Sequence, residues 1–226
     1  MTKCNLVTRS LVAIASCLAM GSASAIPVTW TDWTSISGNT ASGVMGGVSV
    51  TVSGTANFDG VSQTSGPATN YWTQPNPLDL PYTGGTVSNA PTANEQVGLS
   101  TANTVTVTFS SPVNTLYMAL LSVGQPGLAV TYDYDQSFTI DSEGQGFWGN
   151  DATDGVPGPG DTLTMREFHG VLRFAGPVSS LTFTTDPNEF WHAFTFATSA
   201  VPEPATLALL GLALAGLGFS RRRKLH

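Results

Sequence analysis

The chain has 226 residues and a formal net charge of −7. Between residues 26 and 200 it holds fourteen acidic residues and only two basic ones, Arg166 and Arg173, so this segment carries a net charge of −12. A surface of that sign repels nucleic-acid phosphate and anionic lipid, which argues against nucleic acid as a partner. Both cysteines, Cys4 and Cys17, precede residue 26, and this excludes a disulfide framework or a thiolate metal site in that segment.

The first 25 residues have the order of a secretory signal peptide. Lys3 and Arg9 supply a positive start, and residues 11–20 form an apolar run that is too short to cross a bilayer. Ala23 and Ala25 are the small residues that a signal peptidase requires. We therefore predict cleavage after Ala25 and a mature chain that begins at Ile26.

A lipoprotein signal is the alternative for this end of the chain. Residues 14–17 resemble a lipoprotein box, in which Cys17 would be acylated and would become the first mature residue. The apolar run continues past Cys17, and a better cleavage site follows, so we prefer cleavage after Ala25.

Residues 26–200 have the two-residue periodicity of β-strands. Apolar and polar residues alternate over 48–52, 104–109, 130–134 and 181–184, and glycine or proline turn signals separate these runs. The more uniformly apolar runs 116–123 and 190–196 are typical of central strands, 116–123 being covered on both faces. We predict a single all-β domain, an antiparallel β-sandwich of jelly-roll type, without a helix.

Two stretches of this domain, about 59–96 and 141–161, are too polar and too rich in proline for strands. Long loops on a rigid sheet scaffold commonly carry function. We therefore expect any binding site to lie in these two loops.

Acidic residues gather between 133 and 161, where no Lys or Arg occurs. Asp133 and Asp135 are two apart on a predicted strand, so both point to one face, roughly 7 Å apart. Calcium takes six to eight oxygen ligands, although the spacing here does not match an EF-hand. The candidate ligands for Ca²⁺ are Asp133, Asp135, Asp141, Glu143, Asp151, Asp154 and Asp161. The alternative is a set of solvated acids in turns.

Aromatic residues provide a second candidate site. Tyr71, Trp72 and Trp148 lie in the polar loops beside amides and carboxylates, a combination that suits carbohydrate binding. The alternative is that these rings fold inward and pack their loops against the sheet. Trp191 lies in an apolar strand and is predicted to be a core residue.

Catalysis has weaker support. His169 and His192 are the only histidines between 26 and 200, and neither an HExxH motif nor a Gly-x-Ser-x-Gly motif occurs. We expect His192 to be packed on a strand face with Phe190, Phe194 and Phe196. A pair of carboxylates could hydrolyse glycosides, but no pair can be identified. We therefore expect a protein that is not an enzyme, with a secreted glycoside hydrolase as an alternative.

The C-terminal tail has three parts. Pro202, Glu203 and Pro204 precede an uncharged apolar run over 205–220, which would be about 24 Å long as a helix. A basic cluster follows, formed by Arg221, Arg222, Arg223 and Lys224. A short transmembrane helix with the basic cluster on the cytoplasmic side would place the domain outside the cytoplasm.

This tail, over residues 201–226, resembles the PEP-CTERM sorting tail, whose motif falls on Pro202, Glu203 and Pro204. The domain resembles other PEP-CTERM ectodomains only in general style. The resemblance implies cleavage near the motif by an exosortase, a membrane enzyme, and transfer of the domain to the cell surface or an exopolysaccharide matrix. The expected partners are signal peptidase, the exosortase and the inner membrane, with exopolysaccharide as a further candidate.

Three functions follow from these observations. The first is an exported, non-catalytic surface or matrix component. The second is a calcium-assisted carbohydrate-binding module, and the third is a secreted hydrolase.

Overall fold

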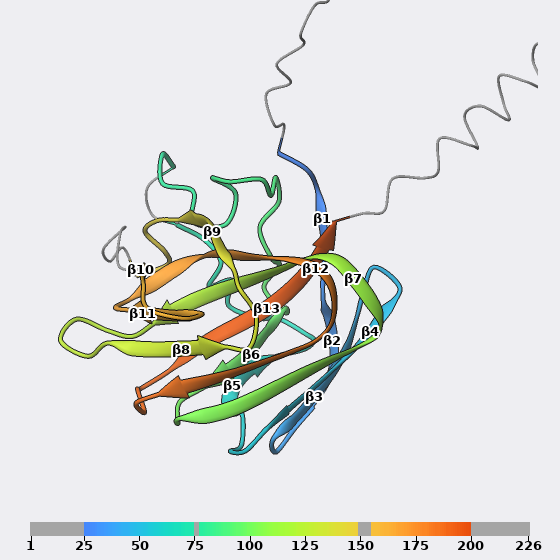
Figure 1. Cartoon of the computed structure of the whole chain (residues 1–226), viewed down its shortest axis with the longest axis horizontal. Helices are drawn as coiled ribbons and strands as arrows, with labels where there is room; N and C mark the ends of the chain where they lie inside the picture. Colours follow the sequence, from blue (N-terminus) through green and yellow to red (C-terminus); the bar gives the residue numbers. More distant parts are fainter. Residues whose placement is uncertain (1–24, 75–76, 149–154, 200–226) are drawn as a thin grey trace, which may run out of the picture.

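The computed structural model describes residues 25–74, 77–148 and 155–199, which form thirteen antiparallel strands in one sheet (Figure 1). The strands are β1 (Val28–Trp30), β2 (Asp32–Ser37), β3 (Thr40–Met45), β4 (Val48–Gly54), β5 (Asp59–Gln63), β6 (Gln96–Leu99), β7 (Asn103–Val123), β8 (Val130–Tyr134), β9 (Thr139–Glu143), β10 (Gly155–Pro157), β11 (Thr162–Met165), β12 (Phe168–Asp186) and β13 (His192–Ser199). No helix in these ranges is long and apolar enough to span a membrane.

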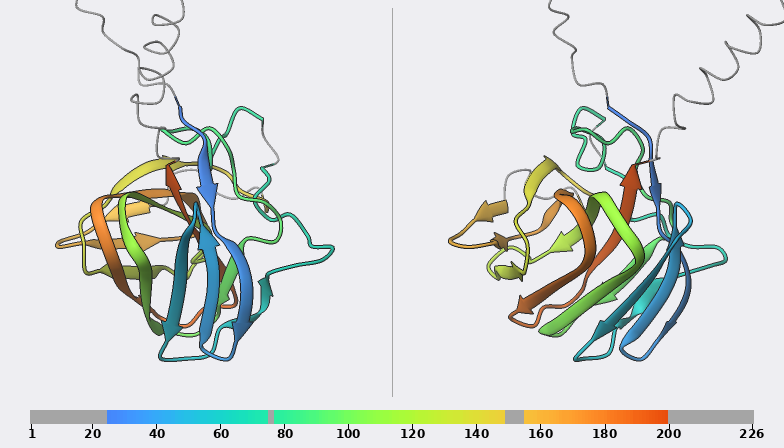
Figure 2. Two further views of the ribbon diagram at one scale, coloured as in Figure 1. Left: turned by 90° about the vertical axis from the view of Figure 1, so that its right-hand side faces the viewer. Right: turned by 45° about the vertical axis from the view of Figure 1, so that its right-hand side comes forward.

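Two long strands, β7 and β12, organise the sheet. They have 21 and 19 residues and pair with each other along most of their length, with register shifts between Ala175 and Ser180. The strands that pair with β7 and β12 change at this irregularity. The first half of β7 pairs with β4, and the second half pairs with β13. The end of β12 pairs with β8, and its beginning pairs with β9. The sheet therefore has two halves that share β7 and β12 (Figure 2).

The main hydrophobic core takes side chains from both halves of the shared strands. In β7, Val105 and Val107 come from the first half, and Leu116 and Met118 come from the second. Alternate residues of a strand point to opposite faces, so these side chains define one face of each half. The main core therefore lies between the two halves.

A second hydrophobic cluster covers the opposite face of one half. Tyr117, Ala119 and Leu121 alternate with the main-core residues of β7 and contact Trp72 and Val87 from the loop between β5 and β6. Residues 116–123 are thus buried on both faces, which confirms the prediction of a covered central strand. This loop between β5 and β6, called the lid loop below, covers the face of the sheet that a further layer of secondary structure would otherwise cover.

The prediction of an antiparallel all-β fold is confirmed. A jelly-roll sandwich is not confirmed, because the hydrogen-bonded ladder joins all thirteen strands into one sheet. The polar stretches are also less irregular than predicted, since β5 lies in the first, and β9 and β10 overlap the second. Backbone pairing with a neighbouring strand overrides the polar composition of these segments.

The first and the last strand of the domain are neighbours in the sheet. β1 pairs with β13, so Val28 lies opposite Ser199, the last residue of the sheet. The predicted signal peptide with Ala23, the tail helix, the motif at Pro202–Pro204 and the basic cluster Arg221–Lys224 lie outside the described residues, and Ala25 is the first described residue.

Candidate functional site: an aromatic pocket

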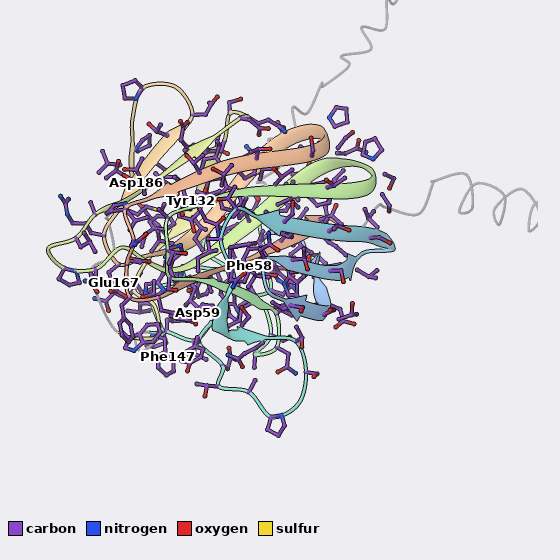
Figure 3. All side chains as sticks on the ribbon, turned by 90° about the horizontal axis from the view of Figure 1, so that it is seen from below. Phe58, Asp59, Tyr132, Phe147, Glu167 and Asp186 are labelled. Carbon is purple, nitrogen blue, oxygen red and sulfur yellow. The ribbon has the colours of Figure 1, made fainter. Side chains whose placement is uncertain are left out.

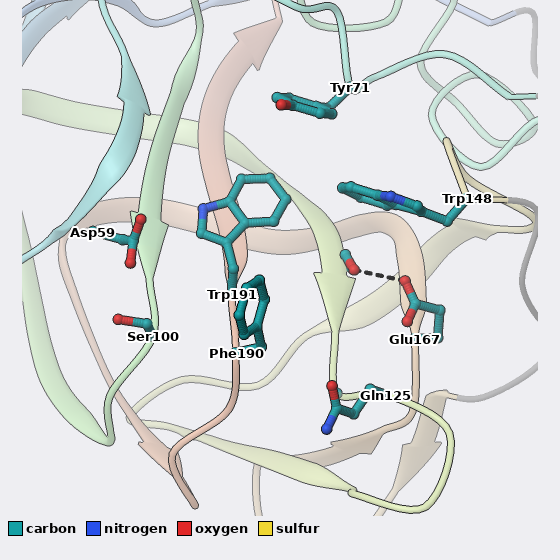
Figure 4. A pocket seen from close by; sticks show the side chains of 10 residues that line it. Asp59, Tyr71, Ser100, Gln125, Trp148, Glu167, Phe190 and Trp191 are labelled. Carbon is teal, nitrogen blue, oxygen red and sulfur yellow. Dashed lines mark hydrogen bonds between the residues drawn. The ribbon is translucent and has the colours of Figure 1, made fainter.

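A pocket of about 600 Å³ opens where several strand connections meet. It lies at the ends of β6 and β7 and beside the connections that precede β12 and β13. Figure 3 labels Asp59, Phe147 and Glu167 within the whole domain, and Figure 4 shows the pocket itself. Its lining combines aromatic rings with polar groups: Asp59, Tyr71, Ser100, Ser122, Gly124, Gln125, Trp148, Glu167, Phe190 and Trp191.

Four aromatic residues belong to the lining, and three of them contact one another. Tyr71 and Trp148 are stacked, with centroids 5.5 Å apart and an interplanar angle of 14°. Trp191 contacts both rings, with centroids 5.4 Å from Tyr71 and 5.7 Å from Trp148. Trp148 is 44% exposed and packs edge-on against Phe147 behind it. The chain therefore presents a ring surface to solvent instead of burying it.

The structure separates the three aromatic residues that the sequence singled out for carbohydrate. Tyr71 and Trp148 come from the two different polar loops and meet in the pocket, as a binding site would require. Trp72 is 1% exposed and packs edge-on against Tyr82, so it holds the first loop on the sheet. Trp72 is a structural residue.

The prediction for the segment 190–196 needs correction. β13 begins only at His192, so Phe190 and Trp191 belong to the preceding connection. Both residues line the pocket: Trp191 is half-buried, and Phe190 is 89% exposed and does not share a packed face with His192. His192 itself is buried as expected, and its Nδ1 pairs with the Glu189 carboxylate.

A buried polar network lies at the pocket floor. The Ser122 hydroxyl donates to Glu167 Oε1 over 2.6 Å, and His169 Nε2 lies 3.4 Å from the same oxygen. Tyr82 completes the network, because its hydroxyl is 3.0 Å from His169 Nδ1. Ser122, Glu167 and His169 are 8%, 7% and 1% exposed, so the geometry of this network is fixed by packing.

The hydrogen bonds assign the tautomer of His169. The Ser122 backbone N–H, which can only donate, points to His169 Nδ1 over 3.3 Å. Burial raises the pKa of Tyr82 well above its ordinary value, and the negative charge of Glu167 raises it further, so the Tyr82 hydroxyl stays protonated and donates as well. Nδ1 is therefore an acceptor, and the proton is assigned to Nε2, which lies 3.4 Å from Glu167 Oε1 but makes no hydrogen bond in the described structure.

The backbone conformation is unusual at Ser122 and Glu167. Ser122 and Glu167 have φ of 55° and 53°, and no other non-glycine residue in the described ranges has a positive φ. Each such residue costs on the order of 1–3 kcal/mol and persists only where its surroundings hold it. The packing around the network is tight, because a Cβ added at Gly146 would lie 2.0 Å from His169 Nδ1.

The acidic residues proposed for calcium do not gather in the part of the chain that the structure describes. Asp133 is exposed on β8, whereas Asp135 is exposed just after the strand ends at Tyr134, so the two do not lie on one strand as predicted. Asp135 accepts a hydrogen bond from the Thr182 backbone N–H. Asp141 instead accepts two bonds from Thr86, from its backbone N–H over 2.8 Å and from its hydroxyl over 2.7 Å, which fastens the lid loop to β9.

The remaining calcium candidates are scattered or fall outside these ranges. Glu143 is exposed on β9, Asp161 lies before β11, and Asp151 and Asp154 lie outside the described residues. No group of three His, Cys, Asp or Glu side chains in the described ranges is arranged to hold a metal ion. Calcium binding stays a prediction.

Comparison with known proteins identifies the tail. The family model for the PEP-CTERM protein-sorting motif matches residues 200–224, which include Pro202, Glu203 and Pro204. The chain thus carries a PEP-CTERM sorting motif, which supports export, processing by an exosortase and membrane anchoring of the C-terminus before surface release. No curated protein and no solved structure matches the chain.

Proposed function

We propose that this exported domain is a non-catalytic surface protein that binds carbohydrate in the aromatic pocket. Such binding would attach the sorted protein to exopolysaccharide at the cell surface or in the surrounding matrix. The observation that carries the proposal is the partly exposed Trp148 ring, which stacks on Tyr71 and contacts Trp191 in the lining of a pocket of about 600 Å³.

The lining suits a sugar in two ways. Ring faces pack against the C–H groups of a pyranose and bury apolar area without needing hydrogen bonds. A few polar groups then fix orientation, as is usual for small-molecule pockets. Ser100 and Gln125 line the pocket and offer a hydroxyl and an amide to a ligand.

The predicted calcium ion bears on the same pocket. Asp151 and Asp154 follow Trp148 closely in the sequence, so an ion held there would order the segment that carries the exposed ring. We propose calcium only as an aid to this site, tested by repeating each binding measurement in calcium and in chelator.

A glycoside hydrolase is the second candidate, because two carboxylates, Asp59 and Glu167, line one pocket. Glycosidases use such a pair as acid and as base or nucleophile. Release of reducing ends from any oligosaccharide that the protein binds would favour the hydrolase, and binding without turnover favours the module.

The test is a glycan array probed with the full-length chain in mild detergent, followed by calorimetry on the glycans that bind. Trp148→Ala should weaken binding by about tenfold or more, as for a central aromatic contact. Val44→Ala is the matched control, because Val44 is also 44% exposed but lies on β3, away from the pocket. An array without bound glycans, or equal affinity for Trp148→Ala and the control, would contradict the proposal.

A further inference from the structure

The aromatic pocket and the C-terminal tail lie at opposite ends of β13. Trp191, which lines the pocket, directly precedes this strand, whereas Ser199 ends it and lies opposite Val28 of β1. β13 has eight residues, so its two ends are roughly 23 Å apart at about 3.3 Å per residue. The tail therefore continues from the side of the domain that is remote from the pocket.

Three segments surround the end of β13, and we call them together the tail pole: residues 46–49, 110–115 and 175–179. In the first segment, a Cβ added at Gly46 would lie 3.0 Å from Thr198 Cγ2. The Thr198 hydroxyl donates to the Thr115 carbonyl of the second segment over 3.4 Å. The second and third segments are the bends of β7 and β12, where Val113 pairs with Val178 (Figure 1). The tail pole is thus continuous around the point at which the chain leaves the sheet.

The tail pole carries no charge, although the domain has a net charge of −12. None of its residues is Asp, Glu, Lys, Arg or His, so all fourteen acidic residues of the domain lie outside it. Its exposed side chains are short, as at Ser111, Pro112, Asn114 and Pro177. An anionic surface is therefore repelled less from this side of the domain.

Charged residues border the tail pole without belonging to it. Asp32 lies opposite Val44 on the neighbouring strand, and the Asp141 carboxylate accepts two hydrogen bonds from Thr86. Arg173 is exposed on β12, two residues before the third segment. This arginine sets a positive charge against the two carboxylates, so the border adds little to the negative field at the pole.

The tail brings this pole to the membrane. The sorting motif supports membrane anchoring of the C-terminus, and the apolar run of the tail begins at Ala205. Ser199 and Ala205 are six residues apart in the sequence, which spans at most about 22 Å. A tether this short gives the pole a high effective concentration at the bilayer, so that even a weak contact is populated.

We propose that the tail pole is a docking surface for the phospholipid headgroups of the membrane that anchors the tail. The uncharged pole approaches the headgroups, and anionic lipid repels the acidic remainder of the domain, so both effects turn the domain the same way. In this orientation the aromatic pocket opens away from the bilayer. The inference goes beyond the proposed carbohydrate function, because it holds for any ligand of the pocket.

The experiment compares two labelled positions on the full-length chain in vesicles of phosphatidylethanolamine and phosphatidylglycerol. With Cys4 and Cys17 replaced by serine, Ser111→Cys places a fluorophore at the tail pole and Gln125→Cys places one at the pocket. Both positions are exposed. Lipids with a nitroxide headgroup should quench the label at 111 at least about threefold more than the label at 125, because roughly 23 Å separate the two ends of β13.

Asn114→Asp tests whether the uncharged surface itself contacts lipid, because it keeps the shape of the side chain and adds a negative charge to the pole. Quenching at 111 should fall about twofold or more at low ionic strength and should recover when salt is added. Asn57→Asp is the matched control, since Asn57 is also exposed but follows β4 at the end away from the pole. This control should leave the quenching unchanged.

Three results would overturn the proposal. Equal quenching at the two positions, or stronger quenching at 125, would contradict the orientation. Quenching at 111 that Asn114→Asp leaves unchanged would show that the tether alone holds the pole near the bilayer. Quenching at 111 that requires an exosortase in the vesicles would assign the surface to that enzyme. None of these results depends on the glycan array, so each leaves the carbohydrate proposal standing.

Discussion

The two hydrophobic clusters of this domain are built from the same strands but differ in chemistry. The main core joins the two halves of the sheet and consists mainly of strand residues, which along the first half of β7 alternate with exposed or partly buried ones. The second cluster is closed by a loop and lies beside the polar network of Tyr82, His169, Glu167 and Ser122. A strand face covered by another strand becomes apolar and rigid, whereas a face covered by a loop can accommodate polar groups at its edge.

The largest expected effect is in the main core. Phe183 is fully buried and stacks on Tyr132, with ring centroids 5.2 Å apart. Phe183→Ala should cost about 3–5 kcal/mol of unfolding free energy, because truncation leaves a cavity between two sheet halves that cannot close. Urea unfolding followed by circular dichroism measures this loss.

Val87→Ala gives the comparison in the loop-covered cluster. Val87 is also fully buried, but the loop that carries it can adjust, so its loss should stay near about 1–2 kcal/mol, the transfer free energy of two carbons. Losses of similar size for the two variants would show that the lid is as rigid as the sheet.

A smaller effect separates two buried tyrosines. The Tyr82 hydroxyl bonds to His169, whereas the Tyr132 hydroxyl has no hydrogen-bond partner in the described structure. Tyr82→Phe should cost about 1 kcal/mol and should also weaken sugar binding, because His169 loses a donor. Tyr132→Phe should leave stability unchanged or slightly raised, since it removes a buried group that bonds to nothing. A loss of stability in Tyr132→Phe would contradict this distinction.

The smallest effect is expected at Glu95, where the lid loop rejoins the sheet. Burial raises the pKa of the Glu95 carboxyl, the hydrogen bonds from Thr92 partly oppose this, and the charge of Asp32 adds to the rise. Because the folded chain holds this proton more tightly, ionisation destabilises the fold as the pH rises from the unfolded to the folded pKa, and the full loss persists above it.

Glu95→Gln should therefore raise the thermal midpoint slightly at pH 7 and leave it unchanged at about pH 3, where the carboxyl is protonated in both the folded and the unfolded state. The gain is small because water screens a partly exposed carboxyl. A lower midpoint at pH 7 would mean that the bonds from Thr92 outweigh burial.

The sequence predicts the parts of this structure that depend on local periodicity. Alternation located β4, β8 and the first half of β7, and uniform burial identified residues 116–123. Tyr71 and Trp148 were recognisable because large rings in polar loops are unusual. These signals require no knowledge of which strands pair.

The rest of the pocket depends on pairing between distant segments. Ser122 and Glu167 are 45 residues apart and meet only because β7 and β12 are neighbours. Their left-handed backbone has no signal in residue type, since neither is glycine or asparagine. Trp191 was assigned to the core because the sequence does not show where β13 begins, and a shift of two residues changes which side chains reach the pocket.

The sheet and the sorting motif occupy separate, adjoining parts of the chain. β13 ends at Ser199, and the matched motif begins at residue 200. No residue of the sheet or of either hydrophobic cluster belongs to the motif. Cleavage within the matched motif would therefore remove no residue of the sheet, and the domain would keep all its strands after processing.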